Sequence, residues 1–216
     1  MKYKYIFLDL DGTLTDPKEG ITKCVQYALE KFNIIEPDLD NLTKCIGPPL
    51  YNSFTEFFGM SDEDAYKAIA YYRERFSKTG LFENAVLPGA CEMLQKLCNS
   101  ARVPVLATSK PRVYADAIVK KYGIRPYLKM ISASELDGTR NNKNEIIEYA
   151  ISTLGIQDRS KIIMVGDRHH DIDAAKTCGI DSCGVRFGYA APGELEAAGA
   201  DYIVSEFDEL YRILIQ

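Results

Sequence analysis

Residues 5–16 read YIFLDLDGTLTD and place two aspartates at the end of an apolar run. A strand alternates its side chains, so residues two apart point to the same side. Asp9 and Asp11 are therefore expected to project together from the end of a strand at Tyr5–Leu8, with Leu10 facing the opposite way. Neighbouring carboxylates repel each other, and a site that keeps both charged needs a cation beside them. The stretch predicts a metal and chemistry on an anionic ligand.

Short apolar runs alternate with helical patterns along most of the chain. We expect strands at Tyr5–Leu8, Val103–Ala107, Lys129–Ser132, Lys161–Val165, Ser182–Val185 and Tyr202–Val204. We expect helices to begin near Gly89, Arg112, Lys143, Asp171, Gly193 and Phe207, with Pro88 and Pro111 in the first turns of two of them. This alternation predicts an α/β fold, a Rossmann-like parallel sheet with helices on both faces. Ligands of such sheets bind at the carboxyl ends of the strands.

One segment, from about Pro17 to Val86, interrupts this alternation with a helical pattern and no convincing strand. Amphipathic helices are expected at Cys24–Phe32 and Glu63–Phe76, and a shorter apolar one at Tyr51–Phe58. Because the segment begins directly at the carboxylates, we interpret it as an inserted α-helical cap that excludes water and contacts the substrate. The alternative is a helical subdomain with no role at the site. The predicted domains are a core of residues 1–16 and 87–216 and a cap of residues 17–86.

Composition excludes several classes of protein. The chain has 216 residues, 46% hydrophobic and 26% charged, which is ordinary for a globular protein. Its formal net charge of −5 gives no support to binding of nucleic acid polymers. No apolar run approaches the roughly 18 residues of a membrane span, and the first residues lack the features of a signal peptide. The six cysteines form no CxxC pair and are interpreted as reduced core residues of a cytoplasmic protein.

A second acidic motif follows another apolar strand, in the sequence VGDRHHD at residues 165–171. Asp167 is expected just past the strand end, and Asp171 near the start of the next helix, where the helix dipole favours an acid. If this strand neighbours the first, three or four carboxylates converge on one point. Oxygen-only ligands suit a hard cation, and Mg²⁺ fits best. His169 and His170 are expected to be bystanders.

Two further residues are candidates because they lie at or after strand ends. Thr108, in the sequence ATSK at residues 107–110, offers a hydroxyl for phosphate oxygens, although the same residue type often serves as a plain helix cap. Lys143 opens a predicted helix, where its charge would offset the carboxylates and an anionic substrate. Arg140 is the alternative for that role.

The ordered set of Asp pair, Thr, Lys and Asp pair resembles the haloacid dehalogenase superfamily of phosphohydrolases over the whole chain. DLDGTLTD fits that family's first motif, ATSK the second, Lys143 the third and GDRHHD the fourth. CIGPPL at residues 45–50 and Gly188-Tyr189 resemble the branch of phosphoglycolate phosphatase-like and 5′-nucleotidase-like enzymes. The resemblance implies a magnesium-dependent phosphatase of small phosphorylated metabolites, phosphoglycolate phosphatase-like. The alternatives are a 5′-nucleotidase acting on nucleoside monophosphates, a sugar phosphomutase, and a non-catalytic binding module on the same fold.

The resemblance also implies the site residues. Asp9 is the nucleophile, which forms an aspartyl-phosphate, and Asp11 is first the acid and then the base. Mg²⁺ is held by the Asp9 carboxylate, the Asp11 backbone carbonyl and Asp167, with Asp171 acting through water or in support. The residues implied at the phosphate are Thr108 and Lys143 as catalytic groups, with Gly12, Ser109 and Lys110 as substrate-binding ones. Candidates for contacting the leaving group in the cap are Gly47, Arg73, Arg75 and Lys18. A monomer or a homodimer is expected.

Overall fold

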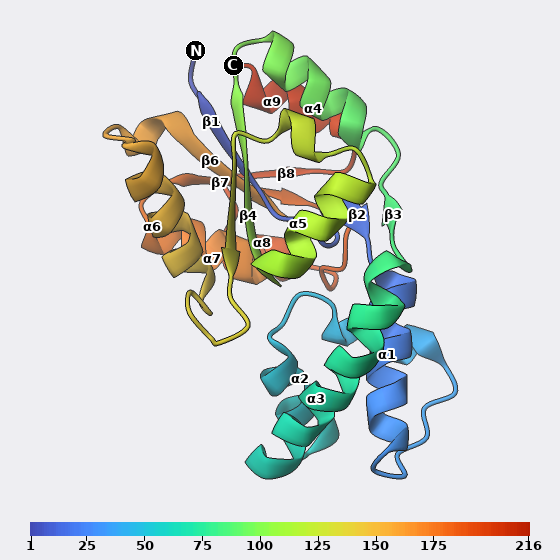
Figure 1. The fold of residues 1–216 in the computed structure, drawn as a ribbon. Helices are drawn as coiled ribbons and strands as arrows, with labels where there is room; N and C mark the ends of the chain where they lie inside the picture. Colours follow the sequence, from blue (N-terminus) through green and yellow to red (C-terminus); the bar gives the residue numbers. More distant parts are fainter. The chain divides into compact units, whose positions relative to one another are not determined.

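The computed structural model describes residues 1–216, which form two compact units (Figure 1). Met1–Asp16 and Val86–Gln216 make up the first, called here the core unit. Pro17–Ala85 make up the second, called here the helical unit.

The core unit is built on a six-stranded sheet with the strand order β5-β4-β1-β6-β7-β8. Every pairing between neighbours in this sheet is parallel. The strands are β1 (Tyr5–Leu8), β4 (Val103–Pro111), β5 (Met130–Ser134), β6 (Ile162–Gly166), β7 (Asp181–Val185) and β8 (Tyr202–Val204). The predicted parallel α/β sheet is therefore confirmed. Its carboxyl-terminal edge brings the ends of β1, β4 and β6 next to one another.

Helices cover both faces of the sheet (Figure 1). On one face, Ile146, Ile147 and Ala175 of two helices join Phe7 and Met164 in a buried apolar cluster. On the other face, α4 and α9 lie side by side. None of the helices combines the length and the apolar character that crossing a membrane requires. The helices are α4 (Ala90–Asn99), α5 (Arg112–Lys121), α6 (Lys143–Leu154), α7 (His169–Thr177), α8 (Glu194–Ala198) and α9 (Phe207–Leu214), with short 3₁₀ helices at Arg125–Tyr127 and Arg159–Lys161.

Two proline placements expected from the sequence are wrong. Gly89 is the N-cap of α4 and has a φ of 94°, so Pro88 lies before the helix. Pro111 ends β4 and is itself the N-cap of α5. In both cases a proline precedes the helix and fixes the entry of the chain, because its ring restricts φ without needing an amide hydrogen. The start of α7 also differs, since it begins at His169, two residues before Asp171.

The helical unit consists of three α-helices and two 3₁₀ helices: α1 (Lys18–Glu30), η1 (Leu39–Cys45), α2 (Leu50–Phe58), α3 (Asp62–Lys78) and η2 (Gly80–Phe82). Its core contains Leu29, Leu42, Phe54 and Phe76, all buried. Helix α3 has the N-cap residue Ser61, whose hydroxyl accepts from the Asp64 amide, a common start signal. Two short strands that the sequence pattern did not predict, β2 (Thr15–Asp16) and β3 (Ala85–Val86), pair as a separate sheet where the chain leaves and re-enters the core unit.

The structure contains no disulfide between the six cysteines. Cys24, Cys45, Cys178 and Cys183 are buried, but Cys98 is exposed, which corrects the prediction that all are core residues.

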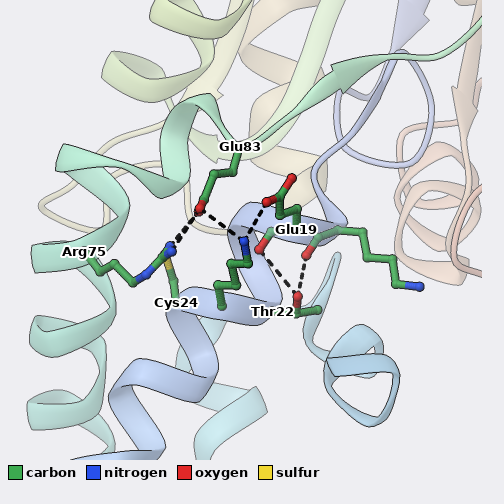
Figure 2. A network of polar contacts seen from close by, with 7 residues as sticks. Glu19, Thr22, Cys24, Arg75 and Glu83 are labelled. Carbon is green, nitrogen blue, oxygen red and sulfur yellow. Dashed lines mark hydrogen bonds and ion pairs between the residues drawn. The ribbon is translucent and has the colours of Figure 1, made fainter. Parts of the chain in front are cut away.

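A polar network ties α1 to the end of α3 (Figure 2). Arg75 makes two parallel hydrogen bonds to Glu83, at 2.7 and 3.0 Å, and a third to the Cys24 sulfur at 3.2 Å. Lys23 lies 2.6 Å from Glu19 and 3.6 Å from Glu83. The Arg75 and Glu83 side chains are each about four-fifths buried, at 21% and 18% exposure. Arg75 therefore stabilises the helical unit by linking α1 to the segment that follows α3.

Replacing Gly20 with alanine is expected to destabilise the protein, against the usual sign for a glycine in a helix. Alanine normally stabilises a helix by about 0.5–1 kcal/mol relative to glycine. Here a Cβ would lie 2.2 Å from the Gly80 carbonyl oxygen and 2.7 Å from that of Glu83. We expect a net loss of about 1–3 kcal/mol, as for other overpacked sites. Thermal unfolding of Gly20→Ala checks this, with the exposed Glu30→Ala in the same helix as control; a raised midpoint would contradict the argument.

Candidate active site

Three aspartates converge at the carboxyl-terminal edge of the sheet. Asp9 follows β1 and Asp167 follows β6, and these strands are direct neighbours. Asp171 lies in the first turn of α7, the helix that follows β6. One carboxylate oxygen from each of the three lies within 4.8 Å of the others, and all three residues are buried. The structure thus brings together two motifs that are more than 150 residues apart in the chain.

Lys143 reaches this group from the first residue of α6. Its Nζ lies 2.9 Å from Asp9 Oδ1 and 2.8 Å from Asp171 Oδ1, and it donates to the Ala107 carbonyl at 3.2 Å. Burial lowers the pKa of Lys143, but Asp171 and Asp9 outweigh it and raise the pKa above its usual value, so the ammonium stays charged. Arg140, the alternative cation, instead pairs with Glu135 and stacks on the Tyr149 ring.

The three carboxylates fit a hard divalent cation. Burial raises the pKa of Asp167 well above its usual range, and the charges of Asp171 and Asp9 raise it further. Burial likewise raises the pKa of Asp171, against the opposing effect of Lys143. Asp167 Oδ1 is buried without any hydrogen-bond partner. A hard cation would compensate the negative charge of the three carboxylates and bind the unsatisfied Asp167 oxygen. Carboxylate oxygens are the ligands expected for Mg²⁺.

Two glycines pack against Asp167. Gly12 has a φ of 76°, and a Cβ there would lie 2.0 Å from Asp167 Oδ2. A Cβ on Gly188 would lie 2.3 Å from the Asp167 Cβ, and the next amide, that of Tyr189, donates to Asp167 Oδ2 at 2.7 Å. Sequence reasoning noted Gly188 and Tyr189 only as branch markers. The signal for a role at the site is that they lie shortly after β7, which ends at Val185 at the same edge of the sheet.

Asp11 does not belong to the group of three carboxylates and has a partner of its own. Its carboxylate makes an ion pair through Oδ2 with the Lys110 ammonium, while Oδ1 is buried without a hydrogen-bond partner. Burial raises the pKa of Asp11, and Lys110 opposes this shift. The charge of Asp9 also raises this pKa, so the prediction that the two carboxylates project to the same side of the strand end stays a prediction.

The ATSK segment contacts the site through the Ala107 carbonyl, which accepts from Lys143, and through Lys110, which pairs with Asp11. Thr108 is buried, and its hydroxyl oxygen accepts from the Lys110 amide at 3.3 Å, which leaves the hydroxyl hydrogen available to a ligand. The Ser109 carbonyl accepts from the Ser134 hydroxyl at 2.7 Å, which fixes this segment against β5.

The other candidates are placed as follows. Gly47 precedes α2 with a φ of 104°, and Arg73 lies half-buried on α3. Lys18 pairs with Asp40 at 2.6 Å, and Arg75 belongs to the network of the helical unit. The predicted contact of these residues with a leaving group stays a prediction. His169 is held by Glu194 at 2.9 Å and, like His170, contributes nothing to the carboxylate group.

The chain is similar to known proteins over nearly its whole length. The family described as haloacid dehalogenase-like hydrolase matches residues 5–185. A 5′-nucleotidase of Pseudomonas aeruginosa is 40% identical over 214 residues, covering 99% of this chain and 96% of that protein. A phosphoglycolate phosphatase of Cupriavidus necator is 28% identical, covering 97% and 92%. The crystal structure of a predicted phosphatase from Clostridium acetobutylicum has a TM-score of 0.96 and 42% identity, covering 100% and 99%.

Proposed function

The chain belongs to the haloacid dehalogenase-like hydrolase family, and on this basis we propose that it hydrolyses small phosphate monoesters through an aspartyl-phosphate on Asp9. One observation carries the proposal. The Asp9 carboxylate lies at the buried end of β1, 2.9 Å from the Lys143 ammonium and clustered with Asp167 and Asp171. The Lys143 ammonium offsets part of the repulsion between this carboxylate and an anionic phosphate, and a cation held by the three carboxylates would offset the rest.

The chemistry divides between two aspartates. An Asp9 oxygen forms a bond to phosphorus while the bond to the alcohol oxygen breaks, and Asp11 gives that oxygen its proton. Asp11 is then deprotonated and takes a proton from water, whose oxygen attacks phosphorus and releases Asp9. The Thr108 hydroxyl donates to a phosphoryl oxygen, and Lys143 balances the charge of Asp9 and the phosphoryl group together.

Asp9, Asp167 and the Asp11 carbonyl, supported by Asp171, are the residues that would hold Mg²⁺. When bound, the ion supplies positive charge that steadies the transferring phosphoryl group. The chain's own part is to keep these oxygens buried and correctly spaced, which Gly12 and the Tyr189 amide do for Asp167.

Nucleoside 5′-monophosphates are the substrates that we propose first, and phosphoglycolate second. The relative named 5′-nucleotidase shares 40% of its residues over almost the whole chain, compared with 28% for the phosphoglycolate phosphatase. The sequence motifs alone had placed phosphoglycolate first, but CIGPPL and Gly188-Tyr189 resemble both groups of enzymes and do not separate the two substrates.

A substrate panel tests both parts of the proposal. With Mg²⁺ present, we expect inorganic phosphate release from p-nitrophenyl phosphate and from adenosine 5′-monophosphate. We expect kcat/KM for the nucleotide to exceed that for phosphoglycolate by about tenfold or more, a difference of about 1.4 kcal/mol in transition-state binding.

The other outcomes separate the alternatives. A preference for phosphoglycolate reverses the order of substrates. Transfer between sugar hydroxyls without phosphate release indicates a mutase. A folded protein that binds Mg²⁺ but turns over none of the esters is a binding module, and the proposed function is then wrong.

A further inference from the structure

Lys110 is the one cation of the core unit's ATSK segment, and its side chain is turned toward Asp11. The Lys110 side chain is 6% exposed and that of Asp11 is 13% exposed, and the ammonium contacts Asp11 Oδ2. A lysine with its charged end removed from water is unusual unless the charge has a partner. Lys110 and Asp11 therefore form a buried ion pair within the site and not a surface ion pair.

An irregularity in β4 produces this placement. The pairing of β4 with β5 runs in register to Thr108, then shifts and resumes at Pro111. Such a bulge bends the strand and redirects the side chains of the inserted residues. The Lys110 amide donates to the Thr108 hydroxyl oxygen at 3.3 Å, so the same residue also orients the hydroxyl predicted to bind phosphate.

We propose that Lys110 is a positioning residue that holds Asp11 for proton transfer to the leaving group. This inference rests on the proposed function. Lysine fixes Oδ2 of Asp11, and the other oxygen, Oδ1, is buried without a hydrogen-bond partner. Oδ1 is then the atom that carries the proton given to the leaving oxygen and later taken from water. This role replaces the one implied by sequence resemblance, in which Lys110 binds the substrate itself.

The consequence is a dependence on the leaving group. A nucleoside alkoxide is a poor leaving group and needs the proton from Asp11, whereas p-nitrophenolate leaves readily without it. Since kcat/KM reports the step in which the leaving group departs, losing the position of Asp11 affects the two substrates unequally. General acid catalysis contributes on the order of 10²–10⁴-fold, which sets the size of the effect.

The experiment compares Lys110→Met with the unaltered chain on adenosine 5′-monophosphate and p-nitrophenyl phosphate. We expect kcat/KM to fall on the order of 10²-fold for the nucleotide and only a few-fold for the aryl ester. Lys110→Arg, which keeps a charged donor, restores most of the loss. Lys129→Met removes an exposed lysine of the same unit and is expected to leave both rates unchanged.

Two results overturn the inference. Equal losses on both substrates indicate a structural role, and a raised KM together with weaker inhibition by inorganic phosphate indicates a phosphate ligand. If Lys110→Met does not fold, Lys110→Gln, a neutral donor, is compared on the same two substrates with the same criteria. Failure of the proposed function is distinct, because the unaltered chain then releases no phosphate from either ester.

Discussion

Asp9→Asn is expected to lower the rate of phosphate release from every substrate by at least about 10⁴-fold. Losses of this size occur when the nucleophile is removed from a set of catalytic residues that act together. Asparagine keeps the size of the side chain and can still accept from Lys143, which lies 2.9 Å from Asp9 Oδ1. The amide oxygen, however, is a weak nucleophile. The fold is expected to survive, because the Asp9 amide still donates to the Val165 carbonyl in the sheet.

Steady-state phosphate release measures the loss, and mass spectrometry of acid-quenched protein tests its cause. The unaltered chain is expected to gain one phosphoryl group on the peptide that contains Asp9, and the variant none. Asp173→Asn, an exposed position on α7, serves as the control and is expected to retain full activity. Activity of Asp9→Asn within tenfold of the unaltered chain would rule out the proposed nucleophile.

The fold and the family were predictable because their signals are local. Apolar runs that end in polar motifs predicted the strands, and the order of the motifs predicted a phosphatase of the haloacid dehalogenase family. The parallel sheet and the family match confirm both. The resemblance already favoured Lys143 over Arg140, and the structure supports this choice, because Lys143 reaches Asp9 whereas Arg140 pairs with Glu135.

Other features depend on register and backbone direction, which a sequence pattern does not contain. The bulge in β4 places Lys110 against Asp11, and no residue type in the ATSK segment predicts that bulge. The contact of the Tyr189 amide with Asp167 uses a backbone hydrogen, so any residue except proline would supply it. The roles of the site residues therefore stay predictions that the variants must test.

Asp167→Asn is expected to raise the stability of the Mg²⁺-free protein while removing its response to Mg²⁺. Burial raises the pKa of Asp167 in the folded state, and the nearby carboxylates raise it further. The folded chain then binds more protons than the unfolded chain, so the free energy of unfolding falls as pH rises above the ordinary aspartate pKa of about 4. Asparagine carries no charge, and its amide nitrogen can donate toward Asp9 and Asp171.

The expected gain at pH 8 without Mg²⁺ is about 1–3 kcal/mol, the cost of a buried unsatisfied group, and it shrinks toward pH 5. Asparagine still accepts from the Tyr189 amide, so the local structure has no reason to change. Mg²⁺ should raise the thermal midpoint of the unaltered chain. At a Mg²⁺ concentration 100 times the dissociation constant, the free energy of unfolding increases by about 2.7 kcal/mol. Thermal unfolding with EDTA or Mg²⁺, between pH 5 and 8, measures all of these effects.

The control Asp173→Asn is expected to follow the unaltered chain in both solutions. A Mg²⁺ response in Asp167→Asn equal to that of the unaltered chain would show that the ion does not bind through this carboxylate. A thermal midpoint of Asp167→Asn below that of the unaltered chain, at pH 8 without Mg²⁺, would contradict the argument that the buried charge of Asp167 destabilises the folded state. The two readouts are independent of turnover, so they test the metal site even if the substrate of the enzyme is not the one proposed.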